Sequence, residues 1–156
     1  MVEDLGLGGG GDAMVKIWWR LNAGRRRRRF PADGGQWLRA EGASQLETRD
    51  HLCAECDFTK AIWRKMQQWL QRKGIAVQTW NKHIEWAIHN AKGKSQQAQI
   101  FRIVYAECIY AIWMERNHRI FEKKHRIWEI IMREVAYICH VRSAPRVKVL
   151  IQSFIF

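Results

Sequence analysis

The sequence has few prolines, few acidic residues and no long apolar run. Its only two prolines are Pro31 and Pro145, so the chain between them can form helices without losing a backbone donor. No apolar run approaches the roughly 20 residues that a membrane-spanning helix needs. The first residues are acidic and glycine-rich, unlike the basic and then apolar start of a signal peptide. We therefore expect an intracellular protein without a membrane partner.

Cysteine is also scarce. Cys53 and Cys56 share one short segment, and Cys108 and Cys139 lie within apolar helical patterns. This spacing does not resemble the disulfide framework of a secreted protein. We expect a reducing compartment, with thiols that are buried or bound to a metal.

Acidic side chains are outnumbered by basic ones. The chain holds 15 Asp+Glu against 27 Lys+Arg, a formal net charge of +12. Residues 45–156 alone hold 10 acidic and 19 basic residues, so the excess belongs to more than one local tract. Such a balance favours a polyanionic partner, either nucleic acid or an acidic lipid surface, and of these we expect RNA or DNA. The alternative is a solvated basic surface without a specific partner.

Residues 1–44 differ in composition from the rest. A glycine run, a tract of five arginines and the turn-forming PADGG leave little apolar content, so we expect disorder. The arginines can bind phosphates or act as a nuclear address, which favours the nucleus over the cytoplasm. An accidental basic run is the alternative. The tract consists of Arg25, Arg26, Arg27, Arg28 and Arg29.

From Gln45 onward, apolar side chains recur at helical spacing. We predict an all-α domain over 45–143, with three or four helices packed through Trp and Ile faces. The expected helices cover about 57–73, 80–91, 96–123 and 126–141. Expected caps are Asp57 or Thr59, Thr79 and Ser95, and expected stops are Gly74 and Gly93.

The apolar segment 144–156 could form a strand, a docked tail or an exposed end, and the sequence does not distinguish these three structures. For the helices, the same spacing predicts which side chains point inward. The inward set is Phe58, Ile62, Trp63, Met66, Trp69, Leu70, Ile84, Ala87, Ile88, Ile100, Ile103, Val104, Cys108, Ala111, Ile112, Ile120, Ile127, Ile130, Ile131, Val135 and Ile138.

Three residues with metal-ligating side chains lie close together before the first helix: His51, Cys53 and Cys56. A zinc site takes four nitrogen or sulfur ligands in tetrahedral geometry, usually as two close pairs. No histidine or cysteine precedes His51, so this segment supplies three ligands at most. The sequence therefore indicates an incomplete zinc site.

Two blocks of the sequence resemble a known family. The first reads ETRDHL, then CDFTKAIW, and the second reads YAECIYAIWMERNHRIFEKK. In order and spacing they are similar to the zinc-binding region that follows the reverse transcriptase in plant LINE-type, non-LTR retrotransposons. The resemblance covers about residues 45–143. The matching residues are Glu47, Thr48, His51, Leu52, Cys56, Phe58, Trp63, Tyr110, Ile112, Trp113, Glu115, Arg116, Asn117, Arg119 and Phe121.

The resemblance implies a zinc knuckle, with His51 and Cys56 at ligand positions, in a region that grips template RNA or target DNA. The chain departs from the pattern because the first two cysteines of the family would fall near Arg39 and Gly42. Cys53 also replaces an expected phenylalanine. The sequence does not contain the reverse transcriptase itself, which implies a truncated element with a degenerate knuckle.

Four basic residues near the end of the third predicted helix are the other candidate nucleic-acid ligands: Arg116, Arg119, Lys123 and Lys124. Arginine can hold phosphate through two hydrogen bonds. The alternative is helix packing, with Glu115 and Arg119 forming an i,i+4 pair.

Together these patterns predict a nucleic-acid-binding remnant of a retroelement protein, and no catalytic residues. The alternative class is a helical interaction or structural fragment that forms a homodimer through its Trp-rich helices and has no nucleic-acid role.

Elemental analysis of zinc tests the incomplete site. We expect no zinc in protein purified free of nucleic acid and without a metal-affinity tag, because three crowded ligands do not complete the tetrahedral set. About one zinc per chain would contradict this expectation and show that other ligands are recruited. About half a zinc per chain would indicate a site shared across a dimer.

Overall fold

The computed structural model describes residues 51–72 and 79–151, and every regular element in these ranges is a helix. The predicted all-α class is therefore confirmed for this part of the chain. The expected disorder of residues 1–44, the stop at Gly74 and the last five residues lie outside it. In chain order the elements are η2 (His51–Glu55), α2 (Asp57–Trp69), α3 (Trp80–Ala91), α4 (Gln96–Asn117), η3 (His118–Glu122), α5 (Trp128–Arg142) and α6 (Pro145–Ile151), where η marks a single π-helical turn.

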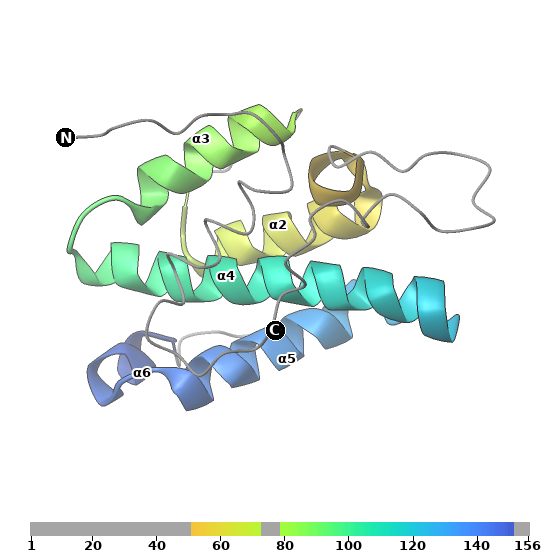
Figure 1. Ribbon diagram of the computed structural model, residues 1–156. Helices are drawn as coiled ribbons and strands as arrows, with labels where there is room; N and C mark the ends of the chain where they lie inside the picture. Colours follow the sequence, from red (N-terminus) through yellow and green to blue (C-terminus); the bar gives the residue numbers. More distant parts are fainter. Residues whose placement is uncertain (1–50, 73–78, 152–156) are drawn as a thin grey trace.

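Helix α4 is the centre of the arrangement. It contacts α2 and α3 as well as α5 and α6, and Figure 1 shows it crossing the molecule between α3 and α5. Its buried side chains include Phe101, Val104, Tyr105, Cys108 and Ile112, all at most 4% exposed. None of the described helices is long and apolar enough to cross a membrane.

Two of the predicted helix caps are confirmed. The Ser95 hydroxyl accepts a hydrogen bond from the Ala98 amide at 3.1 Å, and the Thr79 hydroxyl accepts one from Lys82 at 3.4 Å. The third prediction was wrong, because α2 follows η2 directly and has Cys56 as its N-cap, without a side-chain capping bond. Thr59 is instead buried inside the first turn.

The third predicted helix ends earlier than expected. Regular α-geometry stops at Asn117 rather than near Lys123, and η3 follows as one wider turn. The amide of Lys124 donates to the carbonyl of His118, and Lys123 takes a left-handed conformation with φ of 52°. This turn redirects the chain toward α5, which begins at Trp128.

Three residues predicted to point inward are exposed: Ile88 (45%), Ile127 (60%) and Ile130 (43%). Helix α3 packs on α4 through Trp80, His83, Trp86 and Ala87, so Ile88 lies on its outer face. Helix α5 likewise buries the row Ile131, Met132, Val135 and Cys139. Both helices are covered on one side only, and periodicity alone did not identify which isoleucines that side includes.

The apolar segment after α5 forms a short helix. Pro145 occupies the first position of α6, where the missing N–H of proline is tolerated. Val147 and Ile151 are buried, and α6 contacts α4 and α5. Of the three alternatives, residues 145–151 are therefore a docked tail in helical form.

An imidazole lies at the centre of the aromatic core. His83 is 1% exposed, and its ring centroid lies 4.5 Å from that of Trp63, 5.5 Å from Trp80 and 5.7 Å from both Trp86 and Tyr105. Within the described part of the chain, neither of its nitrogens has a hydrogen-bond partner. Burial lowers the pKa of His83 from 6.5 to about 4, so the ring is neutral near pH 7.

This burial makes stability depend on pH. The unfolded chain binds a proton at His83 below pH 6.5, whereas the folded chain resists it down to about pH 4. The free energy of unfolding should therefore fall by about 2 kcal/mol between pH 7 and pH 5, above the range in which carboxylates titrate. Urea denaturation at both pH values measures the loss. His83→Phe should remove most of it, and an unchanged loss in that variant would contradict the assignment.

Candidate nucleic-acid interface

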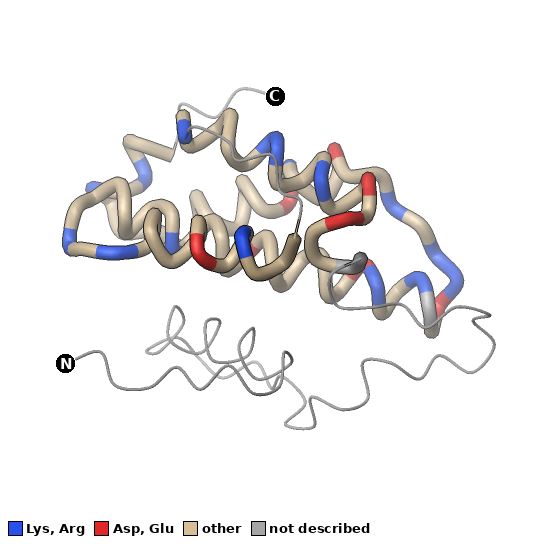
Figure 2. Tube along the Cα trace, turned by 90° about the horizontal axis from the view of Figure 1, so that it is seen from above, with Lys and Arg blue, Asp and Glu red and all other residues tan. Residues whose placement is uncertain are grey.

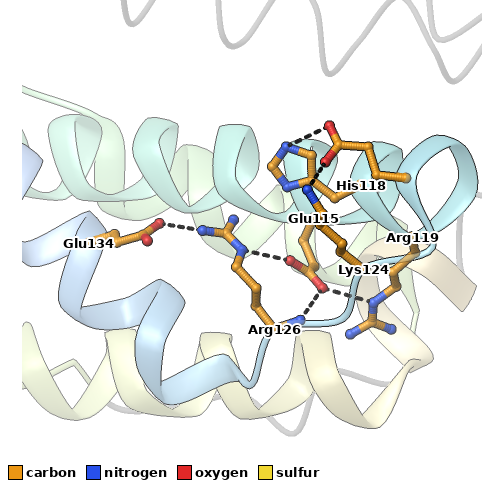
Figure 3. A network of polar contacts seen from close by, with 7 residues as sticks. Glu115, His118, Arg119, Lys124, Arg126 and Glu134 are labelled. Carbon is orange, nitrogen blue, oxygen red and sulfur yellow. Dashed lines mark hydrogen bonds and ion pairs between the residues drawn. The ribbon is translucent and has the colours of Figure 1, made fainter.

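A buried carboxylate organises the end of α4. Glu115 is 1% exposed and accepts three hydrogen bonds, which Figure 3 shows from close by. Arg119 Nε donates to Oε1 at 3.1 Å, the Arg126 amide donates to Oε1 at 2.9 Å, and Arg126 Nε donates to Oε2 at 3.1 Å. Arg126 Nη1 also reaches Glu134 of α5 at 2.7 Å. We call this network the Glu115 clamp, and it ties α4 to the start of α5.

The clamp keeps its carboxylate ionised. Burial by itself would raise the pKa of Glu115, but hydrogen bonds from the Arg126 backbone and from the Arg119 and Arg126 side chains outweigh it. The pKa is therefore lowered overall. The charged carboxylate holds Arg119 and Arg126 in fixed positions, and their side chains stay 34% and 29% exposed.

Two of the predicted nucleic-acid ligands, Arg116 and Arg119, lie at the clamp. Arg119 pairs with Glu115, and its guanidinium carbon lies 4.4 Å from the centre of the Phe58 ring. Arg116 is only 8% exposed, and burial lowers its pKa. The packing alternative, with an i,i+4 pair between Glu115 and Arg119, is what the structure shows. Arg116 is buried and the Arg119 side chain is 34% exposed, and their role as nucleic-acid ligands stays a prediction.

The segment that joins α4 to α5 is strongly basic, and it carries basic residues other than the two arginines of the clamp. We call residues 118–127 the basic connection, and Glu122 is its one acidic residue. Lys123, Lys124 and His125 are exposed, and Figure 2 shows blue lysines and arginines at this end of the molecule as well as at the opposite end. Lys124 Nζ lies 3.1 Å from Glu122, an exposed pair that costs little to open. These two lysines are the predicted ligands that do lie at the surface.

Phe121 is the residue of this segment that sequence reasoning did not select as a ligand. Its side chain is 80% exposed, although phenylalanine is usually buried. In the sequence, Phe121 matches only the pattern of the resembling family. The available signal was an aromatic residue between basic residues, just after the last α-helical turn of α4.

The described part of the chain, 51–72 and 79–151, holds 17 Lys+Arg and 8 Asp+Glu. Two of those eight acids, Glu107 and Glu115, are buried and paired with arginines. The accessible surface therefore keeps most of the positive excess.

The expected zinc ligands have different surroundings. The Cys53 side chain is 2% exposed within the apolar core, and Cys56 is partly buried at the start of α2. The imidazole of His51 lies outside the described side chains. Across the described residues no three His, Cys, Asp or Glu side chains gather as a metal site. The incomplete zinc site stays a prediction.

A buried hydrogen bond connects η2 to α2. The indole Nε1 of Trp63 donates to the backbone carbonyl of Cys53 at 2.8 Å, in the buried interior. This bond ties η2 to the helix that follows it, as metal ligation does in a small zinc domain.

The predicted ligands Arg25 to Arg29 lie outside the described residues. Comparisons with protein-family models, with curated proteins and with solved structures found no match.

Neutralising the clamp should destabilise the fold. Glu115→Gln leaves two arginines facing a neutral amide, so we expect the free energy of unfolding to fall by about 2 kcal/mol. The loss is smaller than for a fully buried ion pair because both guanidinium groups are only partly desolvated. Glu122→Gln is the matched control, with the same charge change on an exposed carboxylate, and it should leave stability nearly unchanged. Chemical denaturation of both variants measures the difference. Equal effects would contradict a structural role for Glu115.

Proposed function

We propose that this protein binds nucleic acid through the basic connection and has no catalytic activity of its own. The observation that carries the proposal is the exposure of Lys123, Lys124 and His125 on a segment held in place by a buried carboxylate. Phosphate contacts supply most of the affinity of sequence-independent binding. A basic segment with a fixed shape meets that requirement without a deep pocket.

The arginines and the lysines of the segment have different roles. Arg119 and Arg126 donate hydrogen bonds to Glu115 and so fix the path of the chain. Lys123 and Lys124 extend from the turn that follows η3. Ordering the segment before binding lowers the conformational entropy that a nucleic acid ligand would otherwise have to offset.

The resemblance to the zinc-binding region of plant non-LTR reverse transcriptases supports the same function. The second block of that resemblance, 105–124, includes the end of α4 and most of the basic connection. We propose that the chain is a remnant of such a protein. The arginine tract, 25–29, would then add phosphate contacts and a nuclear address.

A second candidate function is a helical interaction fragment, and one observation favours it. Apolar side chains on the outer faces of α5 and α6 are exposed by 43–70%: Ile130, Tyr137, Val141, Val149 and Leu150. Self-association through such a face would respond weakly to salt, whereas phosphate binding weakens steeply.

The salt dependence of binding tests the proposed interface. Fluorescence anisotropy of a labelled single-stranded oligonucleotide with the full chain should show affinity that falls as salt rises. Replacing Lys123 and Lys124 by Gln should weaken binding and reduce the slope of log K against log salt by about 1.4, because each phosphate contact on a single strand contributes about 0.7.

The control for this experiment is a second exposed lysine pair, Lys92 and Lys94, between α3 and α4. Its replacement by Gln removes the same charge at the other end of α4 and should leave the slope nearly unchanged. Equal losses in the two variants would show a diffuse basic surface. No binding by the unchanged chain at low salt would contradict the proposed function.

A further inference from the structure

Phe121 is exposed in a chain whose other aromatic side chains near the clamp are used internally. Phe58, for example, is partly buried and packs under the guanidinium of Arg119. Phe121 keeps 80% of its surface accessible to water, which the packing of the fold does not require. A lone exposed apolar residue is ordinary, so exposure alone does not define a site.

The surroundings of Phe121 are what make it informative. Lys123, Lys124 and His125 follow it within four residues, and Glu122 is the one acidic residue of the segment. An accessible aromatic face within a positive, pre-ordered segment is the combination that holds single-stranded nucleic acid, with phosphates on the cations and a base on the ring. A solvated loop would need the charge but not the ring.

We propose that the basic connection is a single-strand binding site in which an unpaired base of RNA or DNA stacks on Phe121. This inference rests on the proposed function and names its ligand class. In a duplex each base is already stacked on its neighbours and offers only its edges in the grooves. A duplex can therefore engage Lys123 and Lys124, but its bases give the ring no free face.

The Glu115 clamp makes the site compatible with this ligand. The Arg126 amide donates a hydrogen bond to Glu115 at 2.9 Å, which holds the end of the basic connection next to α5. The π-helical turn η3 holds its beginning next to α4. Phe121 thus lies on a short segment anchored at both ends. Because the backbone on both sides of Phe121 is held, less conformational entropy is lost when a base stacks on the ring, and more of the stacking energy appears as affinity.

The test compares a labelled single strand of mixed sequence with the duplex of the same sequence, each titrated with the full chain and followed by anisotropy. Phe121→Ala should weaken single-strand binding about 5- to 100-fold, the range expected for loss of one base–aromatic stack. Duplex binding should change less than about twofold, because the phosphate contacts remain. Phe121→Trp should retain single-strand affinity.

Two further variants separate stacking from simpler effects. Tyr137→Ala removes another exposed aromatic side chain, 70% accessible on α5 and outside the basic connection, and should change neither affinity. Phe121→Leu keeps apolar bulk without an aromatic face and should behave like the alanine variant. Phe121 packs little, so all three Phe121 variants should retain the thermal stability of the unchanged chain.

The outcomes distinguish the inference from the function on which it rests. Salt-sensitive binding that is indifferent to Phe121→Ala, or that loses single strand and duplex equally, would overturn the stacking site and leave the proposed function standing. Full affinity in Phe121→Leu would also overturn it, in favour of an apolar contact such as a protein partner makes. If the unchanged chain binds neither ligand, both proposals fail.

Discussion

The buried carboxylate of Glu115 is the constraint on which the connection between α4 and α5 depends. A carboxylate at 1% exposure is stable only when its lone pairs are met by donors, and here two arginines and one amide meet them. The same hydrogen bonds that stabilise the charge also hold Arg126 against α4, and this position sets where α5 begins. The shape of the basic connection is thus a consequence of desolvating one charge.

In the described part of the chain, the aromatic core around His83 contains a buried polar side chain without such compensation. His83 is surrounded by aromatic rings and, among the described residues, gains no hydrogen bond to compensate its burial. It is a neutral ring that fills space beside Trp63 and Tyr105, whose rings stack on each other with centroids 5.3 Å apart. The bond from Trp63 to the Cys53 carbonyl lies in the same region and connects η2 to α2. This buried hydrogen bond and the packing of the aromatic rings together hold η2 against the helix that follows it.

Much of the helical part could be predicted because its signals are local. Hydroxyl caps at Thr79 and Ser95 act on amides three residues away, so the sequence alone locates the starts of α3 and α4. The misplaced isoleucines, Ile88, Ile127 and Ile130, depended on which neighbours cover each helix, and that is a tertiary property. The surroundings of the candidate site residues were not predictable for the same reason. Periodicity placed the cationic residues near one another, but only the fold shows which of them a buried acid has already engaged.

That distinction changes how a basic segment should be interpreted. Arginine suits an internal clamp because its planar group donates several hydrogen bonds in fixed directions and tolerates partial burial. Lysine suits the surface because its ammonium is strongly hydrated and moves on a flexible stem. In this chain Arg119 and Arg126 carry structure while Lys123 and Lys124 remain accessible, as their different chemistry favours. Net charge measures the attraction to a polyanion, but the partition between clamped and accessible cations determines where on the surface that attraction can act.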